Sequence, residues 1–307
     1  MPAWRALRFD FTAMASPCEI MIEGRDEPAM RSAAAAAIDE VRRIESKFSR
    51  YLPHSVVSRI NAAAGKAAIP IDAETASLVD FASALWETSG GRFDATSGVL
   101  RKAWDFAQAR MPAPGELESL LPLVAWGRVE RSATTVRLPS PGMELDFGGF
   151  GKEYAADRAA GVLLERGMPH ALVNLGGDVH VLGPRGLPDA AGQAWQVAVA
   201  RPRRGAPGPL ATIPVMRGGV ATSGDYERFF ERDGRRYSHV LDARTGWPVQ
   251  GWQSITVWAP NTTAAGALCT VAMLQQPTAL DWLDAQGASY LAVRADGEVF
   301  QRSTGTQ

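Results

Sequence analysis

The stretch LDFGGFGKEYAAD, residues 145–157, places three glycines and a lysine directly before a predicted helix. Glycines let backbone N–H groups approach an anion, the ammonium of Lys152 neutralises it, and a helix N-terminus carries partial positive charge. The glycines fall at 148, 149 and 151, and glutamate follows Lys152, so this is neither a dinucleotide fingerprint nor a Walker loop. The stretch predicts an anion site of a different kind.

Four other loops also gather small and polar residues between apolar segments. Taken singly, each could be ordinary turn chemistry, because Gly, Asp, Asn and Ser are the usual turn residues. Taken together, they predict a pocket for a large polar ligand, which needs several loops and a few oriented polar groups. In chain order the five polar loops are 12–17, 90–100, the glycine loop 145–152, 174–178 and 221–248.

His239 lies in the fifth polar loop, in the segment RRYSHVLD, with Asp242 three positions on. A histidine in a strand is often only a structural group. Its polar neighbours favour a ligand-contacting or catalytic role instead. The other three histidines are expected to be structural, and no pair of histidines has metal-ligand spacing.

The elements that must position these loops predict an α+β fold, with a helix-rich N-terminal half and an antiparallel, strand-rich C-terminal half. Helical periodicity predicts long helices, whereas alternation broken by Gly and Pro predicts short strands. We expect one domain over residues 1–307, with a possible sub-boundary near 135–168. Helices are expected at 28–48, 73–89, within 111–123, at 152–167 and at 262–275, and strands at 6–14, 18–24, through 170–258, and in a hairpin at 290–301.

Composition excludes several classes of protein. The net charge is 32 − 33 = −1, which gives no reason to expect a nucleic-acid partner. Cys18 and Cys269 predict neither a disulfide framework nor a zinc cluster. The longest apolar run, 33–38, is too short to span a membrane. As written, the chain has no signal peptide or lipobox, so we expect a cytoplasmic protein, or a periplasmic one if a leader has been removed.

The chain resembles the ApbE family, the FAD:protein FMN transferases, from about residue 12 to residue 275. This resemblance implies an α+β fold built around a flavin-nucleotide cleft. The segments that carry it occur in family order: TAMASPCEI, ESKFSRYLPHSVVSRIN, GGRFDATSGVL, LDFGGFGKEYAADRAA, ALVNLGGD, ATSGDYER and YSHVLDARTGWPV.

The resemblance implies that the protein cleaves FAD at its pyrophosphate, releases AMP and attaches FMN through a phosphoester to a threonine or serine of an acceptor protein. Such phosphoryl transfer depends on positioning and on charge neutralisation, normally with Mg²⁺. The resemblance also implies a catalytic role for His239. The implied FAD-binding residues are Met14 and Tyr51 at the flavin ring, Phe93, Asp94 and Ala95 towards the adenine, and Gly148, Lys152, His239 and Val240 near the phosphates and flavin.

The implied metal site departs from the family pattern. The carbonyl of Gly151 and the hydroxyl of Thr270 are retained, but Gly266 stands where the family has an aspartate ligand. Because a carboxylate is the strongest Mg²⁺ ligand a protein offers, we expect weak or FAD-dependent Mg²⁺ binding. Glu153, which stands where the family has glycine, is a possible substitute ligand. Gly266→Asp is expected to tighten Mg²⁺ at little cost in stability, since glycine is a poor helix residue.

Two alternatives to a working transferase remain open. The first is a non-catalytic FAD-binding protein that acts as a carrier or regulator. The second is a metal-dependent FAD pyrophosphatase that releases FMN and AMP to water. The sequence does not identify the acceptor protein.

Overall fold

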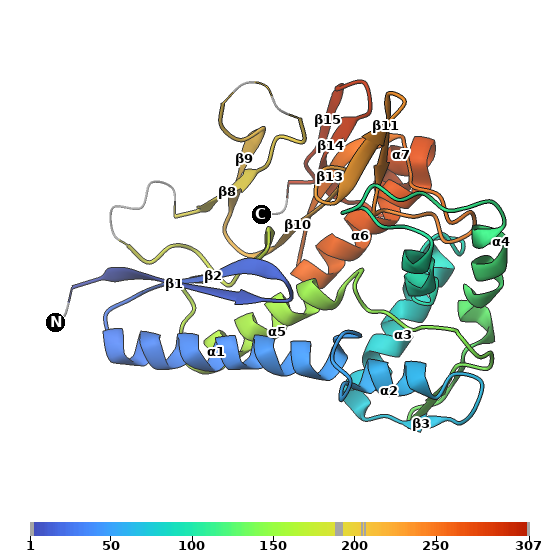
Figure 1. Cartoon of the computed structure of the whole chain (residues 1–307). Coiled ribbons are helices and arrows are strands. Elements are labelled where there is room, and N and C mark those ends of the chain that lie inside the picture. The colour runs from blue at the N-terminus through green and yellow to red at the C-terminus, as the bar shows by residue number, and fades with distance from the viewer. Residues whose placement is uncertain (1–2, 188–192, 204, 206, 306–307) are drawn as a thin grey trace.

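The computed structural model describes residues 3–187, 193–203, 205 and 207–305. Its central element is an eight-stranded antiparallel sheet, in which each neighbouring pair of strands runs in opposite directions (Figure 1). In order across the sheet, the strands are β1 (Arg5–Ala13), β2 (Ser16–Gly24), β6 (Ala171–Leu175), β7 (Asp178–Val181), β10 (Gly218–Gly224), β13 (Trp252–Ala259), β14 (Ser289–Arg294) and β15 (Val299–Arg302).

The N-terminal hairpin belongs to the same sheet as the C-terminal strands. Strand β2 pairs with β6, with Ile20 opposite Val173. Both side chains are fully buried, as are Ile22 and its partner Ala171. The α+β prediction is confirmed. The chain does not divide into a separate helical half and strand half, however, because the N-terminal strands β1 and β2 belong to the same sheet as the C-terminal strands.

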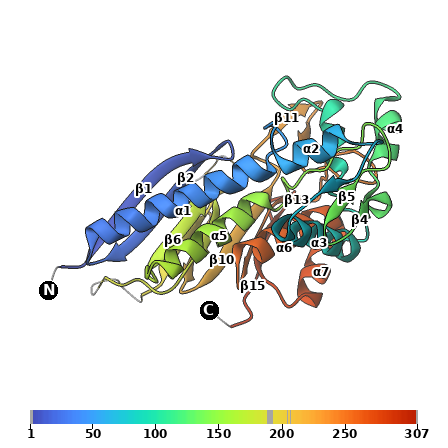
Figure 2. The ribbon, with the colours of Figure 1, turned by 90° about the horizontal axis from the view of Figure 1, so that it is seen from below.

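Helices α1, α5 and α6 pack on one face of this sheet (Figure 2). Side chains cap the N-termini of α1, α3 and α6: Asp26 accepts from Ala29 N, Asp72 from Thr75 N and Asn261 from Ala264 N. The four long predicted helices are confirmed, whereas α7 was not predicted. The helices are α1 (Glu27–Phe48), α2 (Val56–Ala62), α3 (Ala73–Thr88), α4 (Glu116–Leu120), α5 (Gly151–Glu165), α6 (Thr262–Gln275) and α7 (Ala279–Ala285).

A second hairpin covers part of the opposite face of the sheet. It consists of β8 (Trp195–Val199) and β9 (Ala211–Val215), and alternate residues of β8 are buried. This alternation is what a strand with one buried face requires. The hairpin packs on β6, β7 and β10 through a separate apolar cluster: Leu172, Val179, Val181, Trp195, Val197, Val199, Ile213, Val215, Val220 and Leu291.

A third apolar cluster holds the hairpin of β11 (Phe229–Arg232) and β12 (Arg235–Ser238) beside the 3₁₀ helix Ser97–Lys102. Its centre is Trp104, whose indole N–H donates to Gly246 O over 2.9 Å. A small sheet that was not predicted lies beside α3. It contains β3 (Ile69–Pro70), β5 (Thr135–Arg137) and β4 (Glu130–Arg131), in that order.

Both cysteines are buried free thiols. Within the part of the chain that the structure describes, no helix combines the length and apolar character that crossing a bilayer requires.

Close approach of α6 to β10 requires glycine at position 219. A Cβ there would lie 2.2 Å from Thr262 N, the first residue of α6. Gly219→Ala is expected to lower the free energy of unfolding by about 1–3 kcal/mol, the usual cost of overpacking, in a urea titration. Gly161→Ala is the matched control. A Cβ at 161 in α5 meets nothing within 4 Å, so helix propensity predicts a gain of up to about 1 kcal/mol. Equal stability of the two variants would contradict this packing argument.

Candidate functional site

The five polar loops adjoin one another. The first and fourth are joined by a hydrogen bond from Gly176 N to Pro17 O, 3.0 Å long. The glycine loop meets the fourth, since Lys152 Nζ lies 3.4 Å from Gly176 O. The glycine loop also contacts the second polar loop, because Asp146 N donates to Ala95 O over 2.8 Å.

The fifth polar loop is attached to the second. Ala243 N donates to Arg92 O over 3.3 Å. The bond from Trp104 to Gly246, just beyond the second loop, adds a buried link between the same two segments. Loops that are more than two hundred residues apart in sequence therefore surround the N-terminus of α5.

The glycine loop is held from below by an ion pair and an aromatic ring. Asp146 accepts from Gly148 N at 2.9 Å and pairs with Arg50 Nη1 at 2.7 Å. A Cβ at Gly149 would lie 2.7 Å from Cε2 of the buried Phe93 ring, so only glycine allows this close approach.

The N-terminus of α5 has no side-chain cap. Its N-cap residue, Phe150, makes no capping hydrogen bond, in contrast to the caps of α1, α3 and α6. The N–H groups of Phe150 and Gly151 donate to Phe147 O, but that of Lys152 has no backbone partner among the described residues. This N–H group and the helix dipole favour an anion at this end.

Lys152, in the first turn of α5, pairs with Asp178 from β7 over 2.8 Å. The Lys152 side chain is 29% exposed and that of Asp178 only 7%. Burial lowers the pKa of Lys152, but the nearby Asp178 and Glu153 carboxylates outweigh it and raise that pKa overall. Lys152 is therefore a fixed cation, held in place by a buried carboxylate.

Glu153 is buried, and its Oε2 has no hydrogen-bond partner among the described residues. Burial, and then the charge of Asp178, raise the pKa of this carboxyl group against the opposing effect of Lys152. Its side chain lies against Gly266 of α6, where a Cβ would come within 2.5 Å of Glu153 Cγ. The expectation that Gly266→Asp costs little stability is therefore wrong, because Glu153 already fills the space.

Thr270 lies one turn beyond Gly266 on α6. Its hydroxyl is 2.9 Å from Ser223 Oγ of β10, and that oxygen is 3.2 Å from Cys269 Sγ. Among the residues that the structure describes, no three His, Cys, Asp or Glu side chains are grouped as a metal site. A cation here would depend on one carboxylate together with hydroxyl, carbonyl or substrate oxygens.

His239 follows β12. Its backbone N–H donates to Arg228 O over 3.0 Å, and its Nδ1 lies 3.3 Å from the same oxygen. Burial, followed by the charge of Arg228, lowers the pKa of His239 to about 4, and Lys152 contributes in the same direction. The imidazole is therefore neutral near pH 7 and lies within electrostatic reach of Lys152.

The sequence profile of the ApbE family matches residues 14–292. The chain belongs to the ApbE family. The FAD:protein FMN transferase of Treponema pallidum is 34% identical to it over 253 residues, which are 76% of this chain and 70% of the relative.

Two solved structures share the fold. The ApbE protein of Thermotoga maritima aligns with a TM-score of 0.86 and 32% identity, and the alignment covers 98% of each chain. The apo form of the Pseudomonas stutzeri flavinyl transferase ApbE aligns with a TM-score of 0.83 and 27% identity, covering 98% of this chain and 95% of the other. These likenesses confirm the resemblance and the α+β fold predicted from the sequence.

In this ApbE-family chain, Asp94 holds its own loop in shape. Its carboxylate accepts from Thr96 N at 2.7 Å, from Thr96 Oγ1 at 2.5 Å and from Trp126 N at 2.9 Å. Phe93 and Ala95 on either side are buried. The three predicted adenine-end residues thus form a rigid segment beside the glycine loop.

Met14 and Tyr51 both lie at the C-terminal end of α1. Met14 turns the β1–β2 hairpin with a φ of 51°, and its N–H donates to Glu45 in the last turn of α1. Tyr51 is 72% exposed, and Arg50 donates to its hydroxyl over 2.9 Å. An exposed aromatic ring beside a fixed hairpin turn offers the flat surface that a flavin ring requires. Val240, next to His239, packs against the main core.

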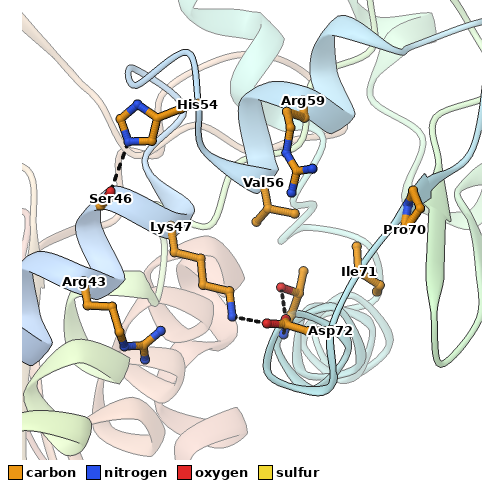
Figure 3. A pocket seen from close by; sticks show the side chains of 10 residues that line it. Arg43, Ser46, Lys47, His54, Val56, Arg59, Pro70, Ile71 and Asp72 are labelled. Atoms are coloured by element: carbon orange, nitrogen blue, oxygen red, sulfur yellow. Dashed lines mark hydrogen bonds and ion pairs between the residues drawn. The ribbon is translucent and has the colours of Figure 1, made fainter.

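A surface pocket of about 390 Å³ lies between the end of α1, α2, β3 and the start of α3 (Figure 3). Lys47, which faces the pocket, pairs with Asp72 and with Glu74. None of the residues predicted for the ApbE-type site lines this pocket. The lining residues are Arg43, Ser46, Lys47, His54, Val56, Arg59, Pro70, Ile71, Asp72 and Thr75.

Asp178 and the Arg50–Asp146 pair were not among the predicted site residues. Asp178 could have been suspected, because it is the carboxylate of the fourth polar loop and begins a strand. Arg50 and Asp146 are 96 positions apart, and neither residue by itself indicates the other.

Lys152→Ala is expected to destabilise the fold as well as the site. It leaves Asp178 buried without its counter-ion, which costs about 3–5 kcal/mol in buried pairs. In urea titrations, Lys152→Ala with Asp178→Asn should recover most of this loss. Arg137→Ala, which breaks an exposed pair with Glu130, is the control and should cost under about 1 kcal/mol. A Lys152→Ala loss no larger than that of Arg137→Ala would contradict the buried-pair interpretation.

The lowered pKa of His239 gives a pH-dependent stability. Between about pH 6.5 and pH 4 the unfolded chain binds a proton at this residue that the folded chain does not, so the free energy of unfolding falls as the pH is lowered. His239→Asn lacks this contribution. Urea titrations at about pH 7 and about pH 5 should therefore show a smaller loss for the variant than for the wild type. Identical losses would show that His239 titrates normally.

Proposed function

We propose that this protein is an FAD:protein FMN transferase. It cleaves FAD at the pyrophosphate, releases AMP and attaches FMN through a phosphoester to a threonine or serine of an acceptor protein. The observation that carries this proposal is the convergence of the five polar loops on the uncapped, lysine-bearing N-terminus of α5. Relatives that match most of the chain bear the name of this activity.

The phosphates of FAD would lie over the glycine loop beside Gly148, whose own N–H is held by Asp146. The backbone N–H groups of Gly149 and Lys152 make no backbone hydrogen bond among the described residues and would face the phosphates. Lys152 supplies the fixed positive charge. Since its orientation is set by Asp178, little conformational entropy is lost when the anion arrives. The flavin ring would rest between Met14 and Tyr51, and the adenine would extend towards the segment Phe93–Asp94–Ala95.

His239 is suited to the role of general base. A neutral imidazole can accept the proton of the acceptor's hydroxyl as that oxygen attacks the phosphorus. Val240 is the next residue and packs against the main core, and both residues follow β12. The attack forms the new phosphoester and breaks the bond to the AMP phosphate, so AMP leaves without a redox step.

Mg²⁺, which reactions of this class normally use, would neutralise charge on the phosphates when bound. The residues present fit such an ion, because a buried carboxylate oxygen of Glu153 lacks a partner and the hydroxyl of Thr270 lies one turn beyond Gly266. The Gly151 carbonyl, at the start of α5, is the third protein group proposed to hold it. Hydroxyl, carbonyl and carboxylate oxygens are the donors that Mg²⁺ prefers.

Incubation with FAD and Mg²⁺, with and without a threonine-bearing acceptor protein, distinguishes the candidate activities. The transferase releases AMP in step with a gain of one FMN in the acceptor's mass. AMP release that does not depend on the acceptor, with free FMN in solution, would identify a pyrophosphatase. Bound FAD with no AMP would identify a carrier.

His239→Ala is expected to reduce FMN transfer by about 10²–10⁴-fold, the usual contribution of a general base, while thermal stability stays near that of the wild type. His54→Ala is the control, because His54 is exposed and its ring lies 3.0 Å from the hydroxyl of Ser46 on α1. The role is refuted if His239→Ala melts far below the wild type while the remaining folded protein keeps full turnover.

A further inference from the structure

We propose that Glu153 and Gly266 form a matched pair, in which Glu153 brings the cation-binding carboxylate from α5 and Gly266 leaves the room for it on α6. This inference rests on the proposed function for the identity of the neighbouring phosphates. It concerns residues of this chain and can fail while the transferase assignment stands.

The packing of the pair is too close for any side chain at 266. An ideal Cβ there would lie 2.5 Å from Glu153 Cγ, 2.7 Å from Oε1 and 2.8 Å from Cδ. Gly266 lies in the first half of α6 and is not at a turn, so backbone conformation does not explain the glycine. The space taken up by Glu153 does explain it.

One carboxyl oxygen of Glu153, Oε2, is buried without a hydrogen-bond partner among the described residues. The exposed fraction of the residue is 8%. The cation beside it in sequence, Lys152, is paired with Asp178. Two buried carboxylates therefore share one ammonium. An unpaired buried carboxylate costs several kcal/mol, and a divalent cation is the ligand that would satisfy it.

Other oxygen donors lie on the same side of α6. Thr270 follows Gly266 by four residues, which places both on one face of the helix. Its hydroxyl is held by Ser223 of β10 at 2.9 Å. Asp178 is less suited to the cation, because Lys152 already occupies one of its oxygens. Among the described residues, Glu153 is the carboxylate of this cluster with a buried oxygen that accepts no hydrogen bond.

Mn²⁺ binding, followed by electron paramagnetic resonance with and without FAD, tests the role of Glu153 independently of catalysis. Glu153→Gln keeps the shape but removes the charge, and should weaken Mn²⁺ binding at least about tenfold in the presence of FAD. The matched control is Glu165→Gln, an exposed residue at the other end of α5, which should leave Mn²⁺ binding unchanged.

Two further variants test the pairing. Gly266→Ala should lower the thermal midpoint, and Glu153→Ala combined with Gly266→Ala should recover it, because the overlap is removed. Glu153→Gly combined with Gly266→Asp moves the carboxylate to α6 and should bind Mn²⁺ within about threefold of the wild type. This exchanged variant also serves if Glu153→Gln does not fold.

The proposal is overturned if Glu153→Gln binds Mn²⁺ as tightly as the wild type, or if the wild type binds FAD but no Mn²⁺. The pairing is overturned if Gly266→Ala lowers the thermal midpoint by the same amount in the wild-type background and in the Glu153→Ala background. Failure of the wild type to bind FAD at all would instead count against the proposed function.

Discussion

The buried ion pair between Lys152 and Asp178 is the interaction on which the candidate site depends. It joins the first turn of α5 to strand β7, and so fixes the helix N-terminus against the sheet. Because Asp178 is almost fully buried, breaking its ion pair with Lys152 would leave a buried carboxylate without a counter-ion. A positive charge at the N-terminus of α5 is unfavourable because it lies at the positive end of the helix dipole. In the folded protein the ion pair with Asp178 offsets this repulsion before a ligand binds.

The fold places the other loops around this point by packing helices and hairpins on one large sheet. Helix α6 reaches β10 closely enough to bring Gly266 against Glu153, and the β11–β12 hairpin carries His239 towards Lys152. The N-terminal hairpin closes the arrangement by pairing with β6. Distant segments therefore share one site because they share one sheet.

Much of the fold was predictable from local signals. Asp72, Gly90 and Gly91 mark the ends of α3, and the apolar periodicity of 28–48 marks α1. The family and the five polar loops were also evident in the order of short motifs. Three contacts of the site were not predictable, because they join residues between 26 and 113 positions apart. These contacts are Lys152–Asp178, Arg50–Asp146 and Glu153 with Gly266. The sequence pointed to the substitution at 266 but not to the reason for it, which is steric.

A crystal structure of the protein with bound FAD tests the central claim most directly, namely that the anion site at the N-terminus of α5 holds the FAD pyrophosphate. The prediction is that the pyrophosphate oxygens lie within hydrogen-bonding distance of Lys152 Nζ and of backbone N–H groups of the glycine loop. A nucleotide bound elsewhere, for example in the pocket between Arg43 and Arg59, with Lys152 still contacting only Asp178 and Gly176, would contradict it.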